Sequence, residues 1–301
     1  MKQLEAALWP KTSRKILHVG AVRASNRKPD IIGLEIDVVG KELKFCVTAD
    51  NNRITLADIV PLSRFLSDEI TAAVLEKIHA EGDHVPCSKG CSACCGPYLV
   101  PLSVPEAFRL HRDISVTTKH EKDLFWKGCL DASRRILGSV SKEHLPLNTT
   151  DLKLIGCWYE SLRLTCPFLL NHECLIYEQR PLACREYFIK GSAEACSGRP
   201  GIAEVVEIPI QMPNVLAQLA SELEGMSSEA IILPLALVWC EENSSRASQT
   251  WPADMMVEKL FEIVRDTASK KPSSVVEQRR AFIDISKKRR RDSRLCRSLS
   301  G

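Results

Sequence analysis

The chain has 301 residues, of which 45% are hydrophobic and 26% charged, and its formal net charge is only +3. This composition excludes disorder along the whole chain, because so many apolar residues can form a substantial core. Its 13 cysteines fall short of the roughly 8–10% typical of small disulfide-stapled proteins. Another explanation for the cysteines is therefore needed.

The N-terminal part, residues 1–80, is predicted to combine a small antiparallel β element with one helix. Apolar and polar residues alternate over 34–38 and over 43–47, on either side of a turn at Gly40-Lys41. A second turn at 50–52 leads into Ile54 and Leu56. Behind Pro61, apolar residues recur at helical spacing from Leu62 to Ile78, which predicts an amphipathic helix that ends near Gly82.

Residues 81–200 contain ten of the cysteines and are predicted to form a metal-binding domain. The first 20 residues of the chain show no apolar signal core, so we expect a cytoplasmic protein. In that reducing compartment, clustered cysteines are typical of metal sites or catalytic thiols. The longest apolar run, residues 230–240, includes Pro234 and is much shorter than the roughly 20 residues that span a bilayer. No membrane association is expected.

Four cysteines lie within the nine residues from Cys87 to Cys95. Thiolates this close repel one another unless a cation neutralises them, and zinc or iron binds sulfur in a tetrahedral shell. The spacing of Cys91 and Cys94 favours a tight turn, for which Gly90 supplies a permissive backbone. The spacing of Cys87 and Cys91 corresponds to one helical turn. Adjacent side chains diverge, so either Cys94 or Cys95 should face a second metal or the core.

A second group of cysteines lies between residues 165 and 196. Pro167 and Pro181 restrict the backbone beside two of these cysteines. Arg180 and Arg185 flank Cys184, where a cation would lower a thiol pKa and stabilise an anionic metal–thiolate centre. Eight thiols allow two four-coordinate sites, or one site and spare redox cysteines. The predicted metal ligands are Cys87, Cys91, Cys94, Cys95, Cys166, Cys174, Cys184 and Cys196.

The other cysteines and the nearest histidines are not predicted to be ligands. Cys129 and Cys157 fall within helical patterns, which favours core packing. His84 and His172 are set aside because the thiolates suffice without them. The cysteines assigned to packing or solvent are Cys46, Cys240 and Cys296.

The remaining body is predicted to be mostly helical, because strand and helix patterns do not alternate after residue 60. The overall class is therefore α+β: a mostly helical, cysteine-rich metal-binding domain with a small N-terminal antiparallel β element. Segment 201–270 is predicted to be a helical C-terminal part. Helices are expected at 105–110, 125–136, 152–164, 215–223, 229–242 with a kink at Pro234, and 255–264.

The last segment, residues 271–301, is basic. It contains ten Lys or Arg and three Asp or Glu, a net charge of +7, which leaves −4 for the rest of the chain. We expect a disordered tail, since no aromatic residues are interleaved with the basic run 287–291 as a platform for base stacking. The alternative to a disordered tail is that residues 287–291 bind the phosphates of a nucleic acid. Nucleic-acid binding is expected only through this tail.

The cysteine pattern resembles the CxxCxxCC or YkgJ-like family of zinc- or iron-chelating proteins. Residues 91–96 resemble its leading motif, residues 174–185 its second signature, and Cys196 its trailing cysteine. The resemblance covers about residues 85–200 and implies metal binding, with no settled reaction. It says nothing about the segments on either side. Flagellin lysine-N-methylases carry a similar cluster, which implies methyl transfer as one alternative, although no glycine-rich nucleotide loop supports it here.

Another alternative follows from the spacing of Cys87, Cys91 and Cys94, which matches the radical S-adenosylmethionine signature. Ala93 in place of the usual aromatic residue, the extra Cys95 and the missing barrel pattern argue against it. We therefore predict a protein that binds zinc or an iron–sulfur cluster. An S-adenosylmethionine-using methylase or radical enzyme, and a nucleic-acid-associated zinc protein, are the alternatives. Protein partners and catalysis are left open.

Overall fold

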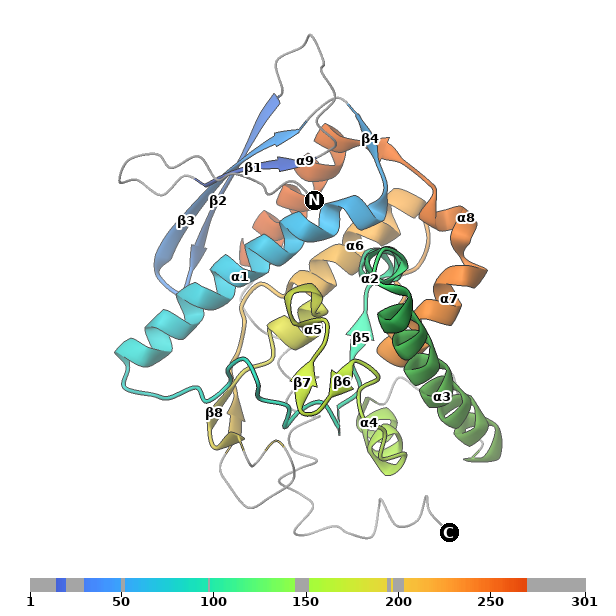
Figure 1. The fold of residues 1–301 in the computed structure, drawn as a ribbon. Helices are drawn as coiled ribbons and strands as arrows, with labels where there is room; N and C mark the ends of the chain where they lie inside the picture. Colours follow the sequence, from blue (N-terminus) through green and yellow to red (C-terminus); the bar gives the residue numbers. More distant parts are fainter. Residues whose placement is uncertain are drawn as a thin grey trace.

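Helices dominate the described part of the chain, and the strands form one small sheet and several short pairs (Figure 1). The computed structural model describes residues 15–19, 30–49, 52–96, 98–143, 152–193, 196 and 203–269. This arrangement confirms the expected α+β class. The basic tail lies outside the described residues, so its predicted disorder stays a prediction.

The predicted N-terminal hairpin is present. Strand β2 (Asp30–Val38) pairs antiparallel with β3 (Lys41–Ala49), with Leu34 opposite Phe45. The turn between them is made possible by Gly40, whose φ of 90° lies in the left-handed region that favours glycine. Strand β1 (Lys15–Val19) adds to β3 in parallel, so the sheet order is β1-β3-β2 and the sheet is not purely antiparallel. That pairing was not predicted, because no turn near the strand indicates it.

Helix α1 (Leu56–Ala80) begins earlier than its apolar stripe suggests. Thr55 and Asp58 form a capping box, with the Asp58 carboxylate accepting hydrogen bonds from the Thr55 amide at 2.8 Å and hydroxyl at 2.7 Å. Pro61 consequently lies inside the helix rather than before it. Strand β4 (Arg53–Ile54) does not extend the hairpin but pairs with β11 (Trp251–Pro252), from the far end of the chain.

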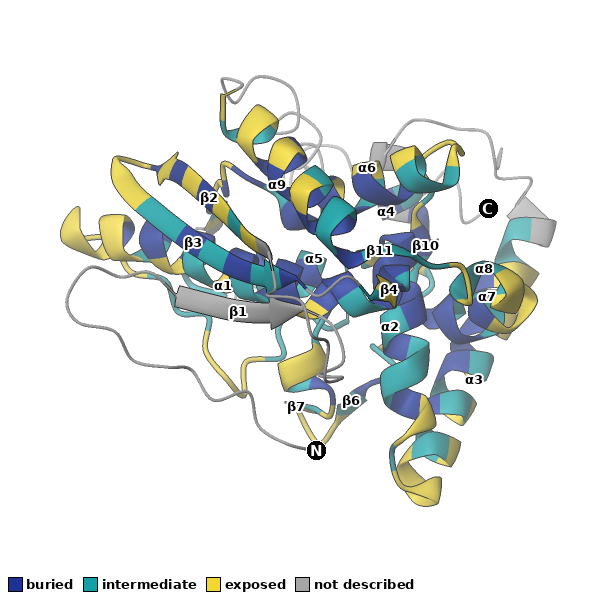
Figure 2. Ribbon diagram, turned by 90° about the horizontal axis from the view of Figure 1, so that it is seen from above, coloured by how far each residue is buried: buried dark blue, intermediate teal, exposed yellow. Residues whose placement is uncertain are grey.

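One face of the sheet packs against helices. Helices α1 and α9 (Ala253–Ser269) contact β2, and α9 also contacts β3. The inward residues of the hairpin are buried, and the Phe45 ring meets Phe65 of α1 edge-on at 5.9 Å between centroids. Helix α6 (Met212–Glu224) packs against both α1 and α9. Figure 2 shows the buried residues on the inward sides of these elements.

The predicted helix over 229–242 is wrong in its first half. Strand β10 (Ile231–Ile232) pairs with β5 (Pro101–Leu102), and a 3₁₀ turn at Leu233–Leu235 follows. Of the expected helix, only residues 236–242 are α-helical. The pairing with a segment distant in sequence, together with the restricted backbone of Pro234, explains the difference. The other helices are α2 (Val104–Ser115), α3 (Lys119–Glu143), α4 (Leu152–Ser161), α7 (Ala236–Glu242) and α8 (Ser244–Ala247).

A continuous cluster of buried apolar residues extends from Leu34 to Val264 and includes parts of the sheet, α1, α2, α3, α6, α7 and α9. A smaller cluster around Ile136 and Trp158 joins α3 to α4. The division of the chain into four segments stays a prediction. Of the helices described, none has the length and apolar character required to cross a membrane.

Candidate metal centre

The first cysteine segment follows α1 and consists of turns. Hydrogen bonds from the amide of Cys91 to the Ser88 carbonyl (3.0 Å) and from the amide of Cys95 to the Ser92 carbonyl (2.9 Å) close two of them. Gly90 has a φ of 93°, as its predicted role in a tight turn requires. The segment is not helical, so Cys87 and Cys91 are not placed by a helical turn, contrary to the expectation from their spacing.

The second cysteine segment runs from residue 165 to 196 through short elements. A hairpin of β6 (Leu169–Leu170) and β7 (Glu173–Cys174) leads into a 3₁₀ turn at Tyr177–Gln179. Helix α5 (Leu182–Arg185) then carries Cys184. Strand β8 (Ile189–Gly191) pairs with β9 (Ala203–Val205).

Backbone hydrogen bonds hold the two segments side by side. The Cys166 amide donates to the Cys95 carbonyl at 2.8 Å, and the Gly191 amide donates to the His84 carbonyl at 3.3 Å. Lys190 forms an ion pair with Asp83 at 2.7 Å. Cysteines far apart in the sequence are thereby brought together.

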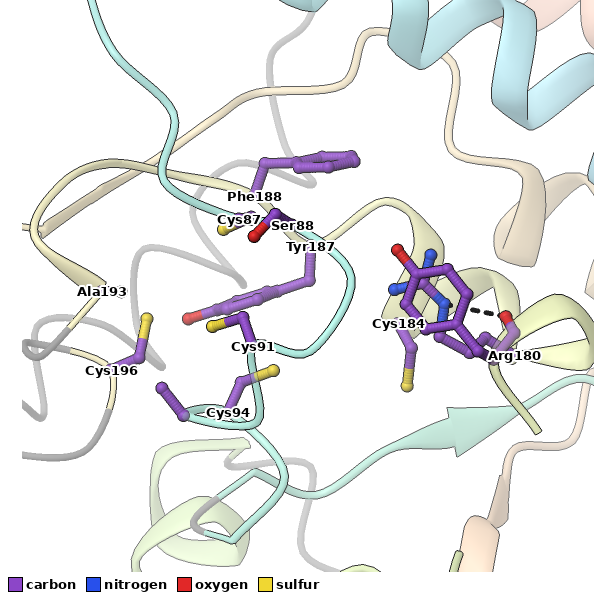
Figure 3. A pocket seen from close by; sticks show the side chains of 12 residues that line it. Cys87, Ser88, Cys91, Cys94, Arg180, Cys184, Tyr187, Phe188, Ala193 and Cys196 are labelled. Atoms are coloured by element: carbon purple, nitrogen blue, oxygen red, sulfur yellow. Dashed lines mark hydrogen bonds between the residues drawn. The ribbon is translucent and has the colours of Figure 1, made fainter. Parts of the chain in front are cut away.

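A cavity of about 70 Å³ lies where the segments meet. Tyr187, Phe188 and Arg180 form part of its wall. Figure 3 shows Cys91, Cys94 and Cys196 around a common space beside the Tyr187 ring, with Cys184 and Arg180 farther along. The predicted ligands that line the cavity are Cys87, Cys91, Cys94, Cys184 and Cys196.

The other three predicted ligands do not line the cavity. Cys166 and Cys174 are close enough to Cys94 and Cys184 to interact with them electrostatically. The side chain of Cys95 is hydrogen-bonded to that of Cys94. Within the described ranges, no three His, Cys, Asp or Glu side chains are arranged to hold a metal ion. The thiols thus gather around one region without forming a closed coordination shell.

Burial keeps these thiols neutral in the absence of a cation. It raises the pKa of Cys166 to about 11 and that of Cys196 to about 12, and it raises the pKa of Cys184 well above its usual value. Backbone amides oppose this effect at some sulfurs: Phe168 donates a hydrogen bond to Cys166, and Ile176 donates one to Cys174. Each donor lies two residues after its sulfur, an arrangement that stabilises a thiolate.

Arg180 is a cation that acts electrostatically on these sulfurs. Burial raises the pKa values of Cys174 and Cys184, and the positive charge of Arg180 opposes the rise, as the sequence predicts. Its guanidinium stacks on the Tyr177 ring at 3.8 Å and donates to the Tyr177 carbonyl at 3.1 Å. Arg185 has a different role, because its guanidinium binds Asp68 of α1 at 2.8 Å.

This donor set fits a soft or borderline cation. Thiolates are preferred ligands of zinc and iron–sulfur iron, whereas magnesium and calcium need oxygen ligands. The described cavity wall includes no carboxylate. The described residues therefore suit a metal that prefers sulfur ligands, such as zinc or iron.

Other cysteines and histidines lie away from the cavity. Cys129 is fully buried in α3, as predicted, and Cys240 is buried in the core. Cys46 is half-buried on the sheet. His172 is exposed, with Nδ1 3.5 Å from the Ser92 hydroxyl. Cys296 and the side chain of Cys157 lie outside the described residues.

Two buried carboxylates anchor the second segment, and the sequence analysis overlooked both. Glu106 of α2 accepts a hydrogen bond from the Leu182 amide at 2.7 Å. Glu186 accepts from the Ser67 hydroxyl of α1 at 2.9 Å and from the Met212 amide at the start of α6 at 3.0 Å. The spacing of Ser103 and Glu106 was a visible signal of a capping box.

Comparison with known families agrees with this geometry. Residues 86–197 match the model of the CxxCxxCC family, described as a "putative zinc- or iron-chelating domain". Residues 86–197 are thus similar to a CxxCxxCC domain, and the match covers less than half of the chain. The match includes every predicted ligand from Cys87 to Cys196 and supports metal binding without naming a reaction. No curated protein and no solved structure matches the chain significantly.

Proposed function

We propose that this protein chelates zinc or iron through the thiolates of its two cysteine segments. The observation that carries the proposal is the cavity at their junction, which is lined by five cysteines from three separate stretches of chain. These stretches contain Cys87 to Cys94, Cys184, and Cys196. Such convergence without a carboxylate is typical of a thiolate metal site rather than of a hydrophobic core.

The proposed ligands are the cysteines of the segment that matches the CxxCxxCC family, and Arg180 supports them. Its charge offsets part of the negative charge that the thiolates of Cys174 and Cys184 bring to a metal. A bound metal would supply a cross-link between the two segments. The chain's own hydrogen bond from Cys166 to Cys95 already aligns them for it.

The position of Cys196 favours a metal with four protein ligands over a metal that keeps one coordination position open. A radical S-adenosylmethionine enzyme requires an iron that only three thiolates hold. Here Cys196 faces the same space as Cys91 and Cys94 (Figure 3), so a fourth thiol stands close by. The enzyme alternatives and the nucleic-acid alternative stay hypotheses. An S-adenosylmethionine binding assay tests the former, and a salt series of DNA and RNA binding tests the latter.

The deciding experiment is metal analysis of the full chain purified without oxygen. We expect bound zinc or iron by mass spectrometry, with brown colour and sulfide if iron forms a cluster and a colourless protein if zinc is bound. Cys184→Ser should lower the metal content, whereas Cys240→Ser, a buried core cysteine away from the cavity, should leave it unchanged. Wild-type protein that contains neither metal, and takes up neither Zn²⁺ nor Fe²⁺ under reducing conditions, would contradict the proposal.

A further inference from the structure

We propose that Arg64 and Asp68 of α1 are positioning residues for the metal centre, which they reach through the turn at residues 177–180. The inference rests on the proposed chelating function and adds to it two residues from outside the cysteine segments. Its basis is a set of hydrogen bonds that tie the backbone of this turn to α1.

Helix α1 uses two opposite faces. The apolar stripe from Leu62 to Ile78 packs in the core, as the sequence predicts. The opposite face carries Arg64, Ser67 and Asp68 at helical spacing, and the first two of them are buried as well. Each of these three side chains bonds to the second cysteine segment. Their partners are Gln179, Glu186 and Arg185, in that order.

Arginine side chains hold the backbone of the turn. Three successive carbonyl groups accept hydrogen bonds from them, those of Glu178, Gln179 and Arg180. Arg64 Nη2 donates to the second carbonyl at 2.8 Å. Arg185 donates to the first through Nη2 and to the third through Nε at 3.3 Å. Arg185 is itself bound to Asp68, whose carboxylate oxygens lie 2.8 Å and 3.0 Å from its Nη1.

The same turn forms part of the cavity wall. Tyr177 and Arg180 line the cavity, with the guanidinium stacked on the ring at 3.8 Å. Lys89 of the first cysteine segment approaches the same ring to 5.2 Å and pairs with Glu178 at 3.8 Å. Cys184, four residues after Arg180, also lines the cavity (Figure 3). A shift of the turn would therefore move a proposed ligand and a contact between the two segments.

Stability alone does not account for the buried charge of Arg64. Its side chain is only 11% exposed, and its carboxylate partner Asp113 lies 3.7 Å away. Asp113 is bound more closely to Arg109, at 2.8 Å. Among the described residues, the Nε atom of Arg64 has no hydrogen-bond partner. A buried ionic group of this kind can often be replaced by an apolar side chain of similar size without loss of stability. The shorter bond to Gln179 therefore favours a positioning role.

The test separates zinc affinity from stability on the full chain. Zinc dissociation constants are measured under reducing conditions by competition with a chromophoric chelator, and urea unfolding measures the stability of the metal-free protein. Arg64→Met should weaken zinc binding roughly tenfold or more, as loss of an outer-shell partner does. Its unfolding midpoint should be unchanged or higher. Arg64→Lys keeps the charge and a donor, so it should recover part of the affinity.

Arg265→Met is the matched control. Arg265 of α9 also donates to a backbone carbonyl, that of Gly33 in β2 at 2.6 Å, and neither residue lines the cavity. This variant should bind zinc as the wild type does.

Asp68→Asn tests the other positioning residue at a carboxylate that is 55% exposed, which limits the risk of misfolding. It should weaken zinc binding less than Arg64→Met, because Arg185 keeps its own bonds to the turn.

Bound Co²⁺ reports on the geometry of the site directly. Its absorption spectrum depends on how the thiolates are arranged around it. We expect the bands of Arg64→Met to differ from those of the wild type, and the bands of Arg265→Met to match them.

The outcomes separate the two proposals. A wild type that binds no zinc overturns both. Wild-type affinity in Arg64→Met and Asp68→Asn preserves chelation and overturns the positioning role. If Arg64→Met fails to fold, unchanged affinity in Asp68→Asn alone overturns it. Weaker binding matched by lower stability of the metal-free variant would show a purely structural role, and would overturn it as well.

Discussion

The carboxylate of Glu106 is almost completely buried and serves two elements. Its Oε2 accepts hydrogen bonds from the Ser103 amide at 3.1 Å and hydroxyl at 2.8 Å, which caps α2. Its Oε1 accepts from the Leu182 amide, at the start of α5. Since Cys184 lies two residues further, Glu106 positions the backbone of a proposed ligand.

Glu106→Ala should destabilise the protein and weaken metal binding. The buried amides of Ser103 and Leu182 would lose their acceptor, at about 1–3 kcal/mol each. Glu121→Ala is the matched control, because Glu121 forms the same capping box with Thr118 at an exposed helix start. It should cost roughly 1 kcal/mol or less. Urea unfolding and zinc titration measure both effects, and equal losses in the two variants would contradict the positioning role.

At the scale of elements, α3 passes directly against the turn that carries Cys166. A Cβ atom added at Gly128 would lie 3.1 Å from the Pro167 carbonyl oxygen and 3.2 Å from the Pro167 Cβ. The close approach of the helix to this turn therefore depends on glycine. Gly138 lies on the same helix with no atom within 4 Å of such a Cβ.

Gly128→Ala should destabilise the protein, because the helix or the turn must move away. Overpacking of this kind costs about 1–3 kcal/mol, more than the roughly 0.5–1 kcal/mol gained from helix propensity. Gly138→Ala should only gain stability. Urea unfolding compares the pair, and metal content shows whether the displaced turn affects Cys166. Stabilisation by both substitutions would contradict the proposed contact.

At the scale of the whole molecule, the main core and the cysteine segments are built differently. The core buries apolar faces of α1, α6 and α9 against the sheet. The cysteine segments consist of turns, strands of two or three residues, a 3₁₀ turn and the four-residue helix α5. Metal binding should accordingly stabilise the segments more than the core.

Removal of the metal should therefore loosen the molecule locally. With a chelator and a reductant, amide hydrogen exchange should rise in residues 83–96 and 165–193 and change little in α1, α6 and α9. Mass spectrometry of proteolytic fragments measures this exchange. The double variant Cys91→Ser/Cys174→Ser controls for the chelator, since its exchange should hardly respond. A uniform rise across the chain would show instead that the core depends on the metal.

Local periodicity accounts for the elements that the sequence predicted well. The stripe from Leu62 to Ile78 predicts most of α1, and the alternation over 34–38 and 43–47 predicts the β2–β3 hairpin. Both patterns arise within one element and its nearest neighbour. The strand at Ile231 was taken for helix, since its pairing with Leu102 leaves no local trace.

The chemistry of the site was also readable from the chain, because thiol spacing and the resemblance of residues 85–200 to a family are properties of the sequence. Which sulfurs share a space was decided by the tertiary structure. Cys196 joins Cys91 at the cavity, while Cys95, directly beside Cys94, lies outside it. The physical reason is that contacts between distant segments position the cysteine-bearing turns: Glu106 and Glu186 hold the backbone on either side of Cys184, and the Cys166 amide binds the Cys95 carbonyl.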